Sequence, residues 1–185
     1  MLHYPLPVLG VCAYSGTGKT TLLTQLLPLL KSKNLSIAVI KHAHHDFDID
    51  QPGKDSYEIR EAGAEQVLIA SRQRMALMKE FHDKREEPNL EECLFAIDSR
   101  NIDLILVEGF KHENISKIEL HRSDLKKPFL FPDDKNIIAV ATDKPLQMKT
   151  SQQVNLDLNN PEEIAEFIIG FYQSQQNTEE QCQTQ

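Results

Sequence analysis

The sequence is poor in cysteine, has no tryptophan and lacks a long apolar run. Its three cysteines, at positions 12, 93 and 182, are odd in number and widely spaced, so we expect neither a disulfide framework nor a zinc knuckle. No apolar stretch approaches the roughly 18 residues of a membrane-spanning helix. The first residues also lack the basic segment of a secretory signal peptide. We therefore expect a soluble, cytoplasmic protein.

Basic residues are too few to balance the acidic ones. The chain of 185 residues carries 20 Lys and Arg against 28 Asp and Glu, which gives a net charge of −8. This charge argues against a protein that binds nucleic acid or a membrane surface through a general basic field. The length fits one domain, which we place at residues 1–173, and the polar, Gln-rich segment 174–185 is expected to be disordered.

One stretch near the amino terminus has the order of features that a phosphate-binding loop requires. Residues 8–13 are typical of a buried strand, and a turn of small residues then leads into a leucine-rich helix. Backbone N–H groups in such a turn, together with the helix N-terminus, bind phosphate oxygens. The lysine adds a full charge, and the hydroxyl after it can ligate Mg²⁺. The predicted phosphate ligands are Ser15, Gly16, Thr17, Gly18, Lys19, Thr20 and Thr21.

The turn departs from the usual G-x-x-x-x-G-K-[ST] pattern at one position, where Ala13 replaces the first glycine. Alanine is tolerated there if its φ angle is negative, which is the case at a strand end. A chance glycine-rich turn is the alternative interpretation. Because a strand precedes the turn and a helix follows it, we favour the phosphate-binding interpretation and refer to residues 13–20 as the phosphate loop.

Strand-like and helix-like segments alternate along the chain. Further strands are expected at 36–41, 67–71, 75–79, 102–107, 117–121 and 136–142, and helices at 20–30, 55–62, 90–100 and 161–172. Pro28 should kink or shorten the first helix, Asp55 and Glu58 have capping-box spacing, and the alternation at 117–121 indicates a half-exposed strand. We predict an α/β P-loop NTPase fold with a mostly parallel central sheet, flanking helices and a small β-hairpin extension.

A phosphate loop needs an acidic partner that holds the metal from a neighbouring strand. Asp103 and Glu108 lie at the two ends of one apolar segment. Only the carboxyl end of a parallel strand lies beside the loop, and Asp103 is about 17 Å from that end at ~3.3 Å per residue. We therefore predict that Thr20 and Glu108 hold Mg²⁺, and that Gly109 lets the backbone approach the γ-phosphate. A loop-capping role for Glu108 is the alternative.

A polar loop at 42–53 leaves the second strand at the end of the sheet where ligands bind in open α/β folds. His42 and His44 would share one face of an extended segment and, with His45, could bind a transition metal. No fourth ligand with a recognisable spacing follows, so we favour contact with phosphate, Mg²⁺ or a partner. Asp46 and Asp48 could orient water or support Mg²⁺, or could be solvated loop acids.

Asp143 follows the last strongly apolar segment, where a base-recognition loop often lies. A carboxylate accepts both N1–H and N2–H of guanine, whereas adenine offers no such pair of donors, so GTP is favoured over ATP. Lys19 and Asp46 are the predicted catalytic residues. No glutamine or arginine is evidently placed to orient water or to stabilise the transferring phosphoryl group, so hydrolysis without a partner should be slow.

Four segments carry a resemblance that is more specific than the phosphate loop alone. They are AYSGTGKTTLL at 13–23, VIKHAHHDFDIDQPGKDSYEIREAGAEQVLIASRQRMALM at 39–78, DLILVEGFKHENISKIEL at 103–120 and IIAVATDKPL at 137–146. Together they resemble the molybdopterin-guanine dinucleotide biosynthesis protein B family, whose members contain a P-loop. The replacement of glycine by Ala13 is the one departure from the general P-loop rule.

The resemblance implies a GTP-binding adapter, usually a homodimer, with weak intrinsic hydrolysis. Such an adapter assists the guanylyltransferase that attaches GMP to the molybdopterin cofactor, and molybdopterin itself is a further candidate ligand. The resemblance also implies that residues 16–21 hold the phosphates, that Thr20 and Glu108 hold Mg²⁺, and that the KHAHHD and GKDS segments form a switch and partner surface.

Two other functions remain open from the residues. A buried strand that ends in Val-Glu-Gly also suits an ATP-dependent small-molecule kinase or ligase. Tighter binding of ATP than of GTP would favour this enzyme. A metal-delivery GTPase would use the histidines at 42–45 and would retain nickel or zinc.

Overall fold

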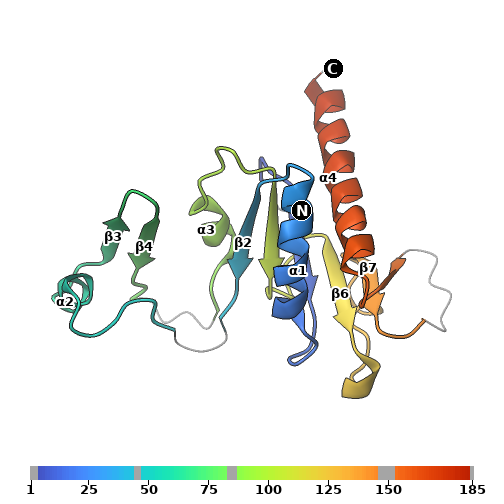
Figure 1. Ribbon diagram of the computed structural model, residues 1–185, viewed down its shortest axis with the longest axis horizontal. Coiled ribbons are helices and arrows are strands. Elements are labelled where there is room, and N and C mark those ends of the chain that lie inside the picture. Colours follow the sequence, from blue (N-terminus) through green and yellow to red (C-terminus); the bar gives the residue numbers. More distant parts are fainter. Residues whose placement is uncertain (1–3, 44–46, 83–86, 146–152, 184–185) are drawn as a thin grey trace. The chain divides into compact units, whose positions relative to one another are not determined.

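The computed structural model describes residues 4–43, 47–82, 87–145 and 153–183. The chain forms two compact units, one of residues 1–42 with 89–185 and one of residues 43–88. The larger unit contains a six-stranded sheet with helices, and the smaller unit contains a two-stranded hairpin and a short helix (Figure 1). The sequence predicts one domain over residues 1–173 and does not separate residues 43–88 from it.

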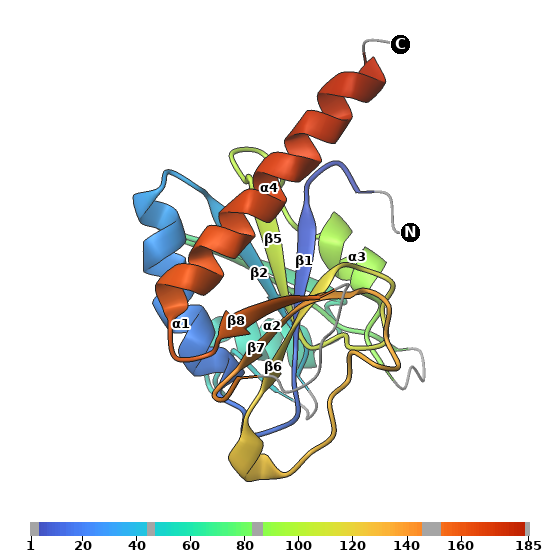
Figure 2. The ribbon, with the colours of Figure 1, turned by 90° about the vertical axis from the view of Figure 1, so that its right-hand side faces the viewer.

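All six strands of the larger unit run parallel, in the order β2-β5-β1-β6-β7-β8 (Figure 2). Their bounds are β1 Val8–Cys12, β2 Ile37–Lys41, β5 Leu104–Glu108, β6 Lys117–His121, β7 Ile137–Thr142 and β8 Val154–Asp157. β1 lies inside the sheet, between β5 and β6. The predicted α/β fold with a parallel central sheet is confirmed. Because parallel strands end at the same edge, the loops after them meet there.

Both faces of the sheet are covered (Figure 2). Helices α1 (Lys19–Ser32) and α4 (Pro161–Gln183) pack on one face, where Leu26 and Ile168 are fully buried in the largest apolar cluster. On the other face α3 (Leu90–Phe95) buries Leu94, and the segment between β6 and β7 buries Phe131. Sheets covered on both faces need apolar strands throughout, which explains why β1 and β5 read as continuous apolar runs.

Helix α1 continues past Pro28 to Ser32, so the proline does not shorten it. Two residues after the end of the helix, Asn34 is left-handed, with a φ angle of +61°. The Asn34 N–H donates to the Lys31 carbonyl at 3.0 Å, and the Leu35 N–H donates to the Leu30 carbonyl at 3.2 Å. These are the two bonds of a Schellman motif, which satisfies the last helical carbonyls and directs the chain into β2.

Strand β6 is buried, and the prediction of a half-exposed strand is wrong. Its polar side chains, Lys117 and Glu119, are 1% and 0% exposed. Lys117 Nζ lies 2.7 Å from Asp134 Oδ2 and donates to the carbonyls of Lys111 and Glu113. The two carboxylate oxygens of Glu119 accept the N–H groups of residues 130 and 131 at 2.8 Å each. The alternating pattern therefore reflects two buried faces, one of them polar and fully bonded.

The carboxyl ends of α3 and α4 differ from the prediction. Helix α3 ends at Phe95 rather than at residue 100, since the chain turns at Asp98, which accepts the Arg100 N–H. Helix α4 continues to Gln183, ten residues into the segment expected to be disordered. Glutamine and glutamate are good helix formers, and extension of an existing helix needs no new nucleus. Among the described residues, no helix is long and apolar enough to cross a bilayer.

The smaller unit contains the predicted hairpin, which is confirmed. Strands β3 (Gln66–Ala70) and β4 (Met75–Lys79) pair antiparallel, and the Ser71 N–H donates to the Arg74 carbonyl across the turn at 2.8 Å. Leu68 and Leu77 face each other on one side of the hairpin and expose 57% and 52% of their surface. Met78, on the opposite side, is buried. The hairpin therefore leaves one apolar side exposed.

Helix α2 (Asp55–Glu61) is tied to this hairpin by one arginine. Arg60 places Nη1 3.1 Å from Glu80 Oε1 and Nη2 2.5 Å from Asp48 Oδ2. Lys54 is the N-cap of the helix and makes no side-chain capping bond, so the predicted capping box at Asp55 is wrong. The unit is held by ion pairs more than by a core, because none of the residues of α2 is buried.

Candidate functional site

The phosphate loop has the conformation that its glycines allow. Gly16 and Gly18 have φ angles of +81° and +100°, a left-handed region that side chains rarely adopt. Ala13, in contrast, is not among the residues with positive φ, which is the condition under which alanine can replace glycine there. The Thr17 hydroxyl donates to the Tyr14 carbonyl at 2.8 Å and closes the turn. Gly18 is the N-cap of α1, so the loop ends at a helix N-terminus.

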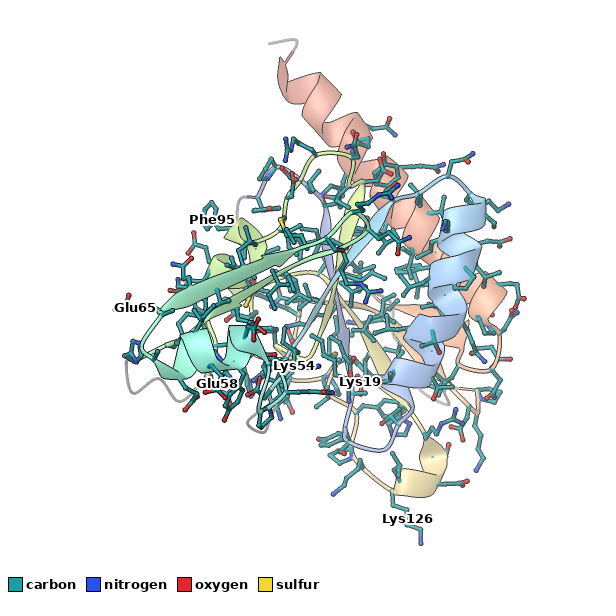
Figure 3. The ribbon with its side chains drawn as sticks, turned by 60° about the vertical axis from the view of Figure 1, so that its left-hand side comes forward. Lys19, Lys54, Glu58, Glu65, Phe95 and Lys126 are labelled. Atoms are coloured by element: carbon teal, nitrogen blue, oxygen red, sulfur yellow. The ribbon has the colours of Figure 1, made fainter. Side chains whose placement is uncertain are left out.

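Lys19 begins α1 (Figure 3) and points back along the loop. Its Nζ donates to the carbonyls of Ala13 and Tyr14 at 3.2 and 3.3 Å. Ser15, Thr20 and Thr21 are exposed beside it, whereas Thr17 is buried. The ammonium thus donates its hydrogen bonds to two loop carbonyls. A bound phosphate group would compete with these carbonyls for the same donors.

Glu108 lies at the carboxyl end of β5, between the ends of β2 and β1, and is 7% exposed. Its Oε2 lies 3.5 Å from Lys41 Nζ. The same ammonium lies 3.5 Å from Thr20 Oγ1. The two predicted Mg²⁺ ligands, Glu108 and Thr20, therefore both lie beside the Lys41 ammonium. Their carboxylate and hydroxyl oxygens are the hard donors that Mg²⁺ prefers. Asp103 is at the opposite end of β5, where it accepts the Ser36 N–H at 2.7 Å.

Gly109 is required for packing. A Cβ atom there would lie 2.6 Å from Cβ of His42, and the φ angle of Gly109 is +93°. The His42 N–H donates to the Glu108 carbonyl at 2.9 Å, and the His42 ring lies 5.0 Å from the ring of Phe110. The ends of β2 and β5 are therefore joined by a hydrogen bond and by close packing beside the Glu108 carboxylate.

The predicted site residues of the loop after β2 that follow His42 belong to the smaller unit or lie outside the described residues. His44, His45 and Asp46 lie outside the described residues. Asp48 belongs to the smaller unit, where it pairs with Arg60. Within the described part of the chain, no group of three His, Cys, Asp or Glu side chains is arranged to hold a metal ion.

Asp143 follows β7 and is bonded to the loop after β6. Its Oδ1 accepts both the N–H and the hydroxyl of Ser123 at 2.9 Å. Burial acts to raise the pKa of Asp143, but these two hydrogen bonds, together with the backbone of Asp143 and the charge of Lys144, leave the pKa below its usual value. The carboxylate is therefore held ionised at the same edge of the sheet as the phosphate loop.

Arg122, just after β6, is a site residue that the sequence analysis missed. Its Nε donates to the Thr17 carbonyl at 2.9 Å, and its guanidinium lies 3.8 Å from where a Cβ of Gly18 would be. Because the peptide between Thr17 and Gly18 is planar and trans, a partner on its oxygen directs the Gly18 N–H to the opposite side. Arg122 thus orients one amide of the phosphate loop. The sequence analysis did not name an arginine that supports the loop, and its prediction that no arginine stabilises the transferring phosphoryl group stays a prediction.

Two further residues of the segment after β6 lie near the phosphate loop. A Cβ at Gly16 would lie 3.9 Å from Leu125, and Lys127 Nζ lies 5.8 Å from the ring centroid of Tyr14. The role of Arg122 and of these two residues follows from the position of β6 next to β1 in the sheet. Strand neighbours are long-range pairings that local sequence patterns do not specify.

Comparisons with known proteins agree with this geometry. A curated relative from Escherichia coli K12, named molybdopterin-guanine dinucleotide biosynthesis adapter protein, is 47% identical over 92% of this chain and 95% of its own length. A relative of the same name from Haemophilus influenzae is 43% identical over 90% of each chain. A crystal structure of molybdopterin-guanine biosynthesis protein B superposes with a TM-score of 0.70, at 27% identity, over 90% of this chain and 99% of the other.

A structure of a MobB homologue from Bacillus stearothermophilus gives a TM-score of 0.66 at 21% identity, over 90% of this chain and 98% of the other, and supports the fold alone. The family model described as molybdopterin guanine dinucleotide synthesis protein B matches residues 8–143. That range contains the phosphate loop, Glu108, Arg122 and Asp143. The chain belongs to the molybdopterin guanine dinucleotide synthesis protein B (MobB) family.

Proposed function

We propose that the chain binds GTP with Mg²⁺ and acts as an adapter in the guanylation of the molybdopterin cofactor to molybdopterin guanine dinucleotide. The observation that carries the proposal is the junction of β1 and α1. There two left-handed glycines and Lys19 lead into a helix N-terminus beside the buried Glu108. The relatives from Escherichia coli and Haemophilus influenzae, both named as adapters of this biosynthesis, support the same role.

The phosphates would be held by the residues of the loop and the first turn of α1, from Ser15 to Thr21. Lys19 would exchange the Ala13 and Tyr14 carbonyls for the β- and γ-phosphate oxygens, which are charged and therefore better acceptors. Thr20 and Glu108 would ligate Mg²⁺, which would neutralise charge on the phosphates. Asp143, held ionised by Ser123, would accept the two donors of guanine.

Hydrolysis would be slow, so the protein would be at most a weak Mg²⁺-dependent GTPase. Lys19 would stabilise charge on the transferring group, and Asp46 is proposed to orient water. Arg122 is bonded through Nε to the Thr17 carbonyl, which suits a positioning role. We therefore assign it to the loop rather than to the reacting phosphate. Rapid steady-state hydrolysis without a partner would contradict the adapter role.

The partner would be the guanylyltransferase that transfers GMP to molybdopterin, and molybdopterin is a further candidate ligand. The chain is also proposed to form a homodimer in the cytoplasm. The exposed apolar side of the hairpin supports the homodimer, because Leu68, Met75 and Leu77 are 57%, 67% and 52% exposed on one face. Apolar side chains gathered on one face commonly mark a protein interface.

The central experiment measures nucleotide affinity and partner binding together. Lys19→Ala should weaken binding of a fluorescent GTP analogue by roughly ten- to a hundredfold, since hydrogen bonds to charged groups are worth about 1.5–3 kcal/mol. Its thermal unfolding should not change, because the Lys19 ammonium donates to two loop carbonyls and not to the core. Lys33→Ala, an exposed lysine at the other end of α1, is the matched control.

A pull-down with the guanylyltransferase, with and without a non-hydrolysable GTP analogue, tests the adapter role. Retention that increases with the analogue and is lost in Lys19→Ala supports the proposal. No retention in either condition would overturn the adapter role while leaving nucleotide binding intact. Tighter binding of ATP than of GTP would favour a small-molecule kinase or ligase instead.

A further inference from the structure

Lys41 occupies the position between the two proposed Mg²⁺ ligands. It is the last residue of β2 and lies directly opposite Glu108 in the β2–β5 ladder. Its Nζ is 3.5 Å from Glu108 Oε2 and 3.5 Å from Thr20 Oγ1. These are the carboxylate and the hydroxyl that the proposed function assigns to the metal. One side-chain cation therefore bridges the oxygens that a divalent cation would share.

The carboxylate needs such a countercharge. Glu108 is buried at 7% exposure, and a buried carboxylate is costly unless it is paired. Lys19, at the start of α1, does not supply the charge, since its ammonium donates to the carbonyls of Ala13 and Tyr14. The two lysines thus have different partners. Lys19 is bonded to loop carbonyls, and Lys41 is bonded to the metal ligands.

Mg²⁺ and this ammonium cannot share the position. Mg²⁺ binds oxygen ligands at about 2.0–2.1 Å in a nearly octahedral arrangement. An ion held by Glu108 and Thr20 would lie close to the Lys41 ammonium, which is 3.5 Å from an oxygen of each residue, and two cations that close repel each other. The ammonium has to leave when the metal arrives.

The departure requires movement of the side chain alone. The backbone at this point is fixed, because Lys41 is paired with Glu108 in the sheet and the next N–H, of His42, donates to the Glu108 carbonyl. Gly109 packs closely against His42, since a Cβ atom at Gly109 would lie 2.6 Å from His42 Cβ. The Lys41 side chain is 56% exposed and has four flexible carbons, so it can rotate into solvent.

We propose that Lys41 is a resident cation that pairs with Glu108 and Thr20 and competes with Mg²⁺ for these two residues. The inference rests on the proposed function for the identity of the metal ligands. Its consequence is that Mg²⁺ supports nucleotide binding at a higher free concentration than it would without Lys41. Lys41 thereby sets the metal requirement of nucleotide binding and not the nucleotide affinity itself.

The first test titrates free Mg²⁺ and measures the affinity for a fluorescent GTP analogue in the full chain. Lys41→Met keeps the apolar stem and removes the charge. The Mg²⁺ concentration at half-maximal gain in affinity should fall about three- to fivefold, the size expected for a partly exposed ion pair. Affinity in excess chelator should stay within about twofold of the wild type. Lys41→Arg, which keeps the charge, and Lys33→Met, on exposed surface, should not lower the Mg²⁺ midpoint.

An unchanged Mg²⁺ midpoint in Lys41→Met would overturn the proposal. Weaker nucleotide binding in chelator would also overturn it, because it would mean that Lys41 contacts phosphate directly. Failure of the wild type to bind guanosine nucleotide at any Mg²⁺ concentration would instead overturn the proposed function.

A second test uses no nucleotide and therefore judges Lys41 even if GTP is not the ligand. In chelator, Lys41→Met leaves Glu108 without its cation and should lower the unfolding temperature by about 2–4 °C relative to Lys33→Met. Millimolar Mg²⁺ should restore that loss and should leave the wild type unchanged. A Lys41→Met variant whose unfolding temperature does not respond to Mg²⁺ would contradict the assignment.

Discussion

The two units of this chain handle charge and apolar surface in opposite ways. In the larger unit, charged side chains such as Lys117 and Glu119 are buried and fully bonded, and the apolar strands are covered on both faces. In the smaller unit, apolar side chains such as Leu68 and Leu77 are exposed, and ion pairs of Arg60 hold the elements together. The larger unit has a core of its own, whereas an isolated hairpin is marginal in water. The small unit therefore depends on ion pairs where the larger unit depends on a buried core.

The largest expected effect comes from breaking the buried charge of the larger unit. Lys117→Met leaves Asp134 and two carbonyls without their donor, and removing one partner of a buried ion pair costs about 3–5 kcal/mol. Urea unfolding followed by circular dichroism measures this loss. Lys135→Met, an exposed lysine beside Asp134, should change the free energy of unfolding by less than about 0.5 kcal/mol. A loss below about 1 kcal/mol for Lys117→Met would show that the pair is not needed.

The next effect tests the exposed side of the small unit. Leu77→Asp places a charge at the centre of the apolar face and should weaken self-association about 30-fold or more, the cost of a lost interface anchor of about 2 kcal/mol. The free energy of unfolding should barely change, because Leu77 is 52% exposed. Sedimentation equilibrium gives the dissociation constant. Gln73→Asp, at the hairpin turn, is the control for the added charge. Equal association of the wild type and Leu77→Asp would place the dimer interface elsewhere.

Within the larger unit, the sequence predicts features that depend on local patterns and misses those that depend on which strands are neighbours. The phosphate loop and the end of β5 were predictable, because Gly16 and Gly18 mark left-handed turns and an apolar run points to Glu108. Arg122 and Lys41 were not, since their roles depend on which strands are neighbours in the sheet. β6 beside β1 brings Arg122 to Thr17, and β2 beside β5 brings Lys41 to Glu108. Such pairings are not encoded in local periodicity.

Burial of β6 was missed for a related reason. Alternation of polar and apolar residues normally indicates one solvated face. Here the polar face is covered by the segment between β6 and β7, which supplies Asp134 and two N–H groups to Lys117 and Glu119. Only the three-dimensional path of that segment distinguishes a buried polar face from a solvated one.

A smaller effect is expected when the support of the phosphate loop is removed. Arg122→Ala loses the Nε bond to the Thr17 carbonyl, so the Gly18 N–H is no longer held toward the phosphate side. Affinity for a fluorescent GTP analogue should fall about tenfold, as for one hydrogen bond to a charged group. Lys126→Ala, on the same loop (Figure 3), is the control. A loss of hydrolysis with unchanged affinity would instead make Arg122 a group that acts on the transition state.

The smallest effect separates the two units by their response to acid. The backbone N–H of Asp50 and then the Arg60 side chain lower the pKa of Asp48 below its usual value. Asp48 therefore stabilises the small unit above the ordinary carboxylate pKa of about 3.9, and this contribution is lost as the pH falls through its lowered folded value. Burial raises the pKa of Glu119, so its contribution to the larger unit has the opposite sign and favours folding as the pH falls through the raised folded value.

Hydrogen exchange at pH values from about 5 down to about 2.5, on either side of the ordinary carboxylate pKa, tests this difference. Amides of α2 and the hairpin should lose protection in the wild type before those of the central sheet do. In Asp48→Asn the small unit should already be less protected at pH 5 and should change less on acidification, because the titrating group is gone. Asp98→Asn, which breaks an exposed pair with Arg100 in the larger unit, should leave exchange in the small unit as it is in the wild type. Simultaneous loss of protection in both units would mean that they unfold as one cooperative body, and the contrast between a self-sufficient sheet and a hairpin held by ion pairs would then fail.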